Sequence, residues 1–126
     1  MRKFERVKQY LEDAVNNTTI GRHGNFWRPL NLDQFKTFAV NVPPRVVNWP
    51  LLVVGDGANS NLIKALQGVA PFGLDAGVPG ATLNRMPDPD FGYAKMPDDR
   101  IKFIKDWIDA GCPDEDETPT PRDSGS

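Results

Sequence analysis

The clearest apolar patterns lie near the two ends of the chain and repeat every three or four residues, as on an amphipathic helix. Near the N-terminus the pattern predicts a helix over about residues 3 to 16, which Asn16 and Asn17 end. Its apolar stripe consists of Phe4, Val7, Leu11, Ala14 and Val15. Near the C-terminus, Asp98 and Asp99 favour the start of a second helix, which Gly111 and Pro113 end. The apolar stripe of that helix consists of Ile101, Ile104, Trp107 and Ile108.

Two shorter helices are predicted between these ends. Asn31 can cap a helix that runs to about Val40, with Gln34 reaching back from the third helical position. The inner face of this helix would consist of Leu32, Phe35, Phe38 and Ala39. The other short helix covers residues 61 to 67, after a cap at Asn59 or Ser60, and Gly68 supplies a left-handed stop.

The connections are rich in proline and glycine. Residues 45 to 58 form an apolar run that Pro50 breaks and Gly-Asp-Gly closes, which predicts one or two short extended pieces and a turn. Residues 69 to 97 predict a long loop across one face of the molecule, and such loops are usually functional or wrap something. Residues 114 to 126 are acidic and contain proline, which is typical of a disordered tail. We therefore expect one domain over residues 1 to 113, of the all-α class with long irregular loops.

Composition narrows the class of protein. The chain is 39% hydrophobic and 25% charged, as in ordinary soluble globular proteins, and its net charge of -2 does not suggest a nucleic-acid binder. Its one cysteine, Cys112, excludes an internal disulfide. No stretch approaches the length of about 20 apolar residues that a membrane span needs. No signal-peptide run follows Met1, so a cytoplasmic location is expected, or a periplasmic one if a leader was removed.

Several short motifs occur along the chain in an order that can be compared with known families. TTIGRHGNFW, residues 18 to 27, contains the only histidine, and with cysteines at Thr19 and Arg22 it would read C-x-x-C-H, the haem-attachment signature. SNLIKALQG, RMP, KMP and DDRIKFIKDWIDAGCP come later and match S-x-L-x-x-x-x-x-G, M-P and a final W-I-x-x-G-x-P. In this order the motifs resemble the class I cytochrome c family over roughly residues 3 to 113. The resemblance implies a small helical domain of cytochrome c-like topology.

The resemblance also assigns roles to single residues. In that family the motif histidine is the proximal iron ligand, a later methionine is often the distal one, and the two cysteines bond the haem. On this chain His23 stands at the proximal position and Met86 or Met96 at the distal one. Thr19 and Arg22 occupy the cysteine positions. Neither a hydroxyl nor a guanidinium can form a thioether, so covalent haem attachment is excluded.

Three interpretations remain. We favour a haem-free domain that acts as a non-catalytic interaction or accessory module, with another protein as its partner. Aromatic side chains would then fill the volume of the porphyrin; the candidates are Phe26, Trp27, Trp49, Phe72, Phe91 and Tyr93. Alternatively, His23 and Met86 or Met96 could hold haem noncovalently in an electron carrier. A third hypothesis is a copper(I) site formed by His23, Met86, Met96 and Cys112, whose ligand types suit that ion.

The same residues also have simpler interpretations. His23 could be a loop residue bonded to the backbone, the two methionines could fill gaps, and Cys112 could cover the end of the last helix. No G-x-S-x-G motif supports hydrolase chemistry, so we assign no catalytic residue. Four aspartates could attract calcium, but their spacing favours turns and caps; they are Asp88, Asp90, Asp98 and Asp99. HGNFWRPL could form an exposed aromatic patch that binds a protein.

Overall fold

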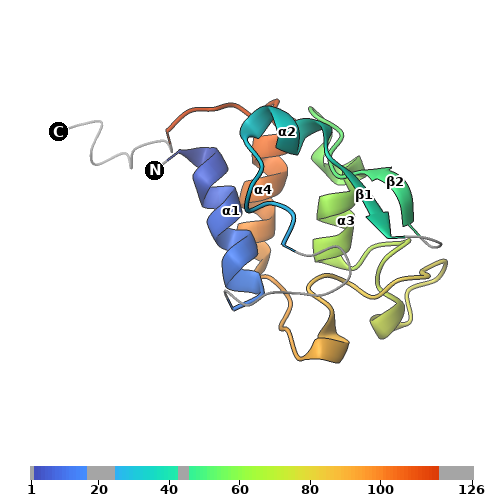
Figure 1. The fold of residues 1–126 in the computed structure, drawn as a ribbon. Helices are drawn as coiled ribbons and strands as arrows, with labels where there is room; N and C mark the ends of the chain where they lie inside the picture. The colour runs from blue at the N-terminus through green and yellow to red at the C-terminus, as the bar shows by residue number, and fades with distance from the viewer. Residues whose placement is uncertain (1, 17–24, 43–45, 117–126) are drawn as a thin grey trace.

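The computed structural model describes residues 2–16, 25–42 and 46–116. This part of the chain is a mainly helical small domain with 44% helix and one antiparallel hairpin (Figure 1). The elements are α1 (Lys3–Ala14), α2 (Leu32–Thr37), β1 (Ala39–Val42), β2 (Val46–Pro50), α3 (Asn61–Gln67) and α4 (Asp98–Asp109). The expected all-α class is therefore right in its main feature, and the hairpin is an addition to it.

Helices α1 and α4 lie side by side (Figure 1). Their apolar stripes face each other, and Phe4 stacks on Trp107 with ring centroids 6.0 Å apart. Helix α1 ends at Ala14, two residues earlier than expected, because Asn16 adopts a left-handed conformation at φ 54°. Helix α4 ends where the sequence predicted, and Gly111 has a φ of 93°.

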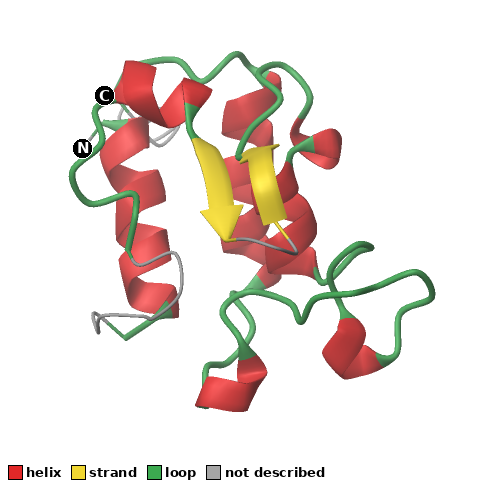
Figure 2. Cartoon of the chain, turned by 45° about the vertical axis from the view of Figure 1, so that its right-hand side comes forward, coloured by secondary structure: helices red, strands yellow, loops and turns green. Residues whose placement is uncertain are grey.

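Helix α2 is shorter than expected because the chain changes to a strand at Ala39. The prediction of a helix to Val40 is wrong at its C-terminal end. Ala39 pairs with Pro50 and Val40 with Trp49 in the hairpin, which Figure 2 shows as two antiparallel arrows. β-Branched valines favour this extended pairing over a helix. The short extended piece predicted within residues 45 to 58 is confirmed as β2.

The predicted capping box at the start of α2 is confirmed. The Asn31 side chain accepts a hydrogen bond from the Gln34 N–H at 2.9 Å, and the Gln34 side chain accepts one from the Asn31 N–H at 2.9 Å. Both bonds satisfy N–H groups that have no partner within the helix.

Replacing Asn31 by alanine should lower the free energy of unfolding by about 1 kcal/mol, because the cap of a very short helix is lost. Gln9 is an exposed residue on α1, so Gln9→Ala is the matched control and should change stability by less than about 0.5 kcal/mol. Urea unfolding of both variants measures the difference. An Asn31→Ala variant as stable as the control would show that the cap does not stabilise α2.

Helix α3 has the predicted bounds, and Gly68 ends it with a φ of 70°. Ser60 stands at its N-cap, but the Ser60 hydroxyl accepts a hydrogen bond from the Val53 N–H instead of capping the helix. The predicted long loop follows and contains two single helical turns, Leu74–Ala76 and Pro89–Phe91. Arg85 holds this loop together, since it pairs with Asp75 at 3.6 Å and donates to the Pro87 carbonyl at 2.9 Å.

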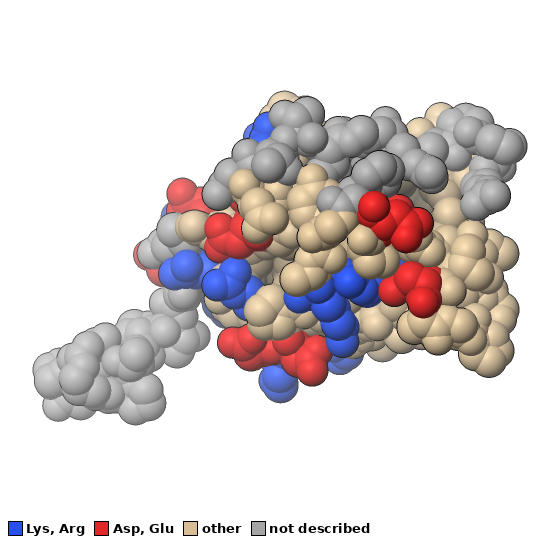
Figure 3. Space-filling model, turned by 90° about the horizontal axis from the view of Figure 1, so that it is seen from below, with Lys and Arg blue, Asp and Glu red and all other residues tan. Residues whose placement is uncertain are grey.

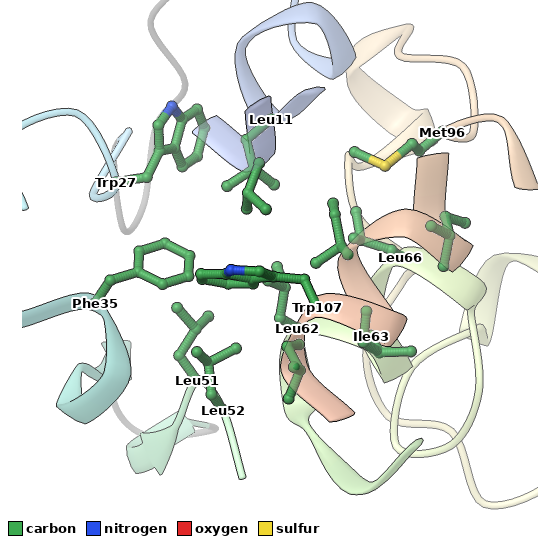
Figure 4. Close-up of a cluster of buried hydrophobic side chains, with 14 of the residues drawn as sticks. Leu11, Trp27, Phe35, Leu51, Leu52, Leu62, Ile63, Leu66, Met96 and Trp107 are labelled. Atoms are coloured by element: carbon green, nitrogen blue, oxygen red, sulfur yellow. The ribbon is translucent and has the colours of Figure 1, made fainter. Parts of the chain in front are cut away.

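The buried side chains form two clusters. The main cluster joins α1, α2, α3 and α4 and contains Leu11, Phe35, Leu66, Met96 and Trp107 among others (Figure 4). The satellite cluster lies under the hairpin and the long loop. It consists of Val46, Ala65, Phe72 and Leu83. Helix α3 contributes to both clusters, and the partly buried Val40 packs against both.

The first residues of the predicted tail are paired with the start of α1. The Lys3 N–H donates to the Glu115 carbonyl at 2.8 Å, and Arg2 forms an antiparallel bridge with Asp116. Residues 117 to 126 of that predicted tail lie outside the described residues. Within the described part of the chain, none of the helices has the length and apolar character needed to cross a membrane.

Candidate functional site

Of the predicted iron ligands, the structure describes the two methionines, and they pack against different clusters. His23, Thr19 and Arg22 lie outside the described residues. Met96 belongs to the main cluster and is only 2% exposed, whereas Met86 is half-buried against the satellite cluster. The two alternative distal ligands therefore pack against different clusters.

The surroundings of Met96 consist of packed apolar side chains. Figure 4 shows its thioether above Leu66 and near the side of the cluster where Leu11 lies. A thioether is a weak acceptor and a flexible filler of irregular gaps, which is the role it has here. An iron could approach this sulfur only if the apolar side chains around it moved apart. The described residues therefore do not fit a porphyrin in this conformation.

The segment that follows the histidine motif in the sequence contributes aromatic rings to the main cluster. Trp27 is 4% exposed, and its ring meets that of Phe26 edge to face at 5.2 Å. Phe26 in turn stacks on Phe38 at 4.9 Å. The hypothesis of an exposed aromatic patch in HGNFWRPL is thus wrong for Trp27, which is buried, whereas Phe26 is partly buried against the main cluster.

The other predicted aromatic fillers have different positions. Trp49 and Phe72 meet edge to face at 6.1 Å in the satellite cluster, away from Met96. Tyr93 is partly buried against the main cluster. The side chain of Phe91 lies outside the described set. Of the two tryptophans proposed to occupy the porphyrin volume, only Trp27 shares a cluster with Met96.

A polar junction fixes the segment that follows the histidine motif to α1. The Glu12 carboxylate accepts hydrogen bonds from the Trp27 indole at 2.8 Å and from Arg28 Nε at 2.6 Å and Nη2 at 3.0 Å. One turn earlier on α1, Lys8 donates to the Leu30 carbonyl at 2.6 Å. No sequence motif marks these residues, and only the fold shows that they are partners.

The junction predicts a pH effect on stability. Hydrogen bonding to Arg28, supported by Trp27, lowers the pKa of Glu12 below its ordinary value of 4.5, and partial burial opposes this only in part. A carboxylate with a lowered pKa in the folded state stabilises the protein above pH 4.5, and this stability is lost as the pH falls through the folded pKa. Glu12→Gln should therefore lose less stability than the wild type between pH 7 and pH values below 4.5.

Urea unfolding at several pH values measures this difference, and Arg28→Gln provides the matched background. With Arg28 absent, Glu12→Gln should have a much smaller pH-dependent effect, because the main cause of the lowered pKa is gone. Equal acid sensitivity of the wild type and Glu12→Gln would contradict the assigned junction.

The copper hypothesis is contradicted by the positions of its ligands. Met96 comes just before the start of α4 and Cys112 just after its end, and a 12-residue helix is about 18 Å long. The two sulfurs cannot bind the same ion. Cys112 is 1% exposed and its N–H donates to the Trp107 carbonyl, so it covers the end of α4. Burial raises the pKa of its thiol to about 11, which keeps it protonated near neutral pH.

The four aspartates considered for calcium have structural roles or point to solvent. The Asp88 carboxylate accepts from the Asp90 N–H at 2.9 Å and from the Asn84 side chain at 3.0 Å, which is the expected turn. Asp98 pairs with Lys95 at the start of α4. Among the described residues, no three histidine, cysteine or acidic side chains form a group that could hold a metal ion.

A surface groove lies between the end of α3 and α4. It is an open groove of about 440 Å³. Its walls are Gln67, Val69, Lys95, Asp98, Ile101, Lys102 and Lys105. Each lysine is paired with an aspartate, at 3.2 Å, 2.5 Å and 2.9 Å respectively. Figure 3 shows basic and acidic side chains interspersed on the face seen from below, which leaves no broad field of one sign there.

Comparison with known proteins adds no relative. No protein family, no curated protein and no solved structure matches this chain. The functional proposal below therefore rests on the residues and contacts of the chain itself.

Proposed function

We propose that this chain is a haem-free, cytochrome c-like domain that acts as a non-catalytic interaction module. The observation that carries the proposal is the filled interior around Met96 and Trp27. These side chains are 2% and 4% exposed, and Phe35 and Trp107, at 0% and 3%, close the same cluster. Large aromatic side chains bury about 150–250 Å² each and can replace the contribution of a missing ring to the core.

The arrangement of the elements supports the cytochrome c-like part of the proposal. The helices at the two ends of the described chain pack on each other through Phe4 and Trp107. Between α3 and α4 runs the long loop that contains both Met-Pro pairs. This is the order in which the motifs of that family follow one another, with TTIGRHG directly after the first helix.

The interaction role follows from the same proposal. Without haem, a domain of this topology has no haem iron to transfer electrons. We therefore assign its role to binding through its surface. The segment after the histidine motif is fixed to α1 by Glu12, Trp27 and Arg28, which gives the surface a defined shape without a cofactor.

The alternative is an electron carrier with noncovalent haem. Its distal ligand would be Met96 rather than Met86, because Met96 belongs to the main cluster, which also contains Trp27. The side chains around Met96 would have to separate before a porphyrin could enter, which makes this the second candidate.

A haemin titration followed by absorbance distinguishes the two. The haem-free proposal predicts no saturable shift of the Soret band, and the same weak response from the wild type, His23→Ala and Met96→Leu. Met86→Leu is the matched control, since this methionine belongs to the other cluster. A stoichiometric Soret band that is lost in His23→Ala or Met96→Leu would overturn the proposal in favour of the carrier.

A further inference from the structure

We infer that Asp114, Glu115 and Asp116 form an electrostatic clasp, which closes the two ends of the described chain and opens without unfolding the domain. Figure 1 shows the segment after α4 returning to the start of α1. Lys3 makes two contacts with Glu115: its N–H donates to the carbonyl at 2.8 Å, and its Nζ pairs with the carboxylate at 2.7 Å. Arg2 donates to the Asp114 carbonyl at 3.1 Å and bridges to Asp116.

The clasp performs the task of a helix cap. The first four N–H groups of a helix have no partner within it, and arginine at the N-cap position is a poor substitute for serine, threonine or aspartate. Arg2 stands at this position, and its own N–H is satisfied by Glu5 at 2.9 Å. Lys3 is the first residue of α1, and the carbonyl of Glu115 is what satisfies its N–H.

The contacts on the two sides of Pro113 differ in kind, which places a hinge there. On one side, Cys112 is buried and the Trp107 indole donates to the Pro113 carbonyl at 3.0 Å, so the chain is fixed to α4. On the other side, residues 114 to 116 are exposed, and their contacts with Arg2 and Lys3 are ion pairs and hydrogen bonds. Exposed ion pairs are weak and are screened by salt.

Opening of the clasp should therefore be local and controlled by ionic strength. It frees the Lys3 N–H and the first turn of α1, next to the stacked rings of Phe4 and Trp107. The interior of α1, represented by the buried Leu11, stays folded. This device is independent of whether the domain binds haem.

Amide exchange with water, followed by NMR on the full chain, tests the inference. In the wild type, raising NaCl from about 0.05 M to about 1 M shortens the Debye length from roughly 14 Å to 3 Å. We expect exchange at Lys3 to become about three- to tenfold faster, with exchange at Leu11 unchanged. The variant Asp114→Asn/Glu115→Gln/Asp116→Asn should exchange fast at Lys3 already at low salt and respond little to added salt.

Two further variants make the test specific. Glu115→Lys should open the clasp, and the swap Lys3→Glu/Glu115→Lys should close it again, because the ion pair is restored with reversed sign. Asp106→Asn breaks the exposed pair with Lys102 on α4 and should leave exchange at residue 3 unchanged. A residue 3 amide that responds neither to salt nor to neutralisation would overturn the inference, as would equal acceleration at Leu11, which would mean that opening is global.

Discussion

Trp27→Ala should lower the free energy of unfolding by about 3–5 kcal/mol, which is the usual cost of truncating a buried large aromatic side chain. The indole is 4% exposed, and its removal leaves a cavity beside Phe26 and α1. It also removes the indole N–H that donates a hydrogen bond of 2.8 Å to the Glu12 carboxylate. Urea unfolding monitored by circular dichroism measures the loss without relying on tryptophan fluorescence.

Two companion variants separate the causes of that loss. Trp27→Phe keeps most of the ring but not the donor, so it should cost clearly less than Trp27→Ala. Trp49→Ala should also cost less, because Trp49 is half-buried in the satellite cluster. A loss below about 1 kcal/mol for Trp27→Ala would mean that this side chain does not fill the interior of the main cluster.

Gly73→Ala should destabilise the protein by about 2–4 kcal/mol, because it combines backbone strain with a steric clash. Gly73 has a φ of 98°, which side chains other than glycine rarely adopt. A Cβ at this position would collide with the Gly68 carbonyl oxygen and lie 2.7 Å from Val78 Cγ2. The loop after α3 would have to move away from the end of that helix.

Gly80→Ala is the matched control in the same loop. Gly80 has a similar φ of 80°, but a Cβ there would meet nothing within 4 Å. Its cost should be about 1 kcal/mol, from strain alone. Thermal unfolding of both variants isolates the clash as the difference between them, and equal losses would show that the loop does not press on the end of α3.

The regular elements could be predicted where a local signal marks both their ends. Helix α3 lies between Ser60 and Gly68, and α4 lies between its acidic first turn and Gly111, so their bounds follow from local chemistry. Helix α2 shows the limit of this reasoning. Its start at Asn31 is local, but its end depends on the pairing of Val40 with Trp49, a partner that periodicity within one segment does not reveal.

The candidate site could be predicted only as a set of residue types. Met86 and Met96 have the same local sequence, Met-Pro, and nothing in it tells against which cluster each will pack. The hydrogen bonds from Trp27 and Arg28 to Glu12 join residues 15 or more positions apart, so the local sequence HGNFWRPL does not reveal that Trp27 is buried. The length of α4 excludes a shared copper site for Met96 and Cys112. The structure, and not the ligand types, shows this.

The central claim is that this domain completes its core with its own side chains. Thermal unfolding of the protein with and without haemin tests it most directly, because a ligand that binds the native state raises the midpoint. At a free ligand concentration of 100 times Kd the gain is about 2.7 kcal/mol, or about 10 °C for a domain of this size. We predict one cooperative transition whose midpoint haemin does not raise. A non-cooperative transition without haemin, or a rise of about 10 °C that His23→Ala abolishes, would contradict the account.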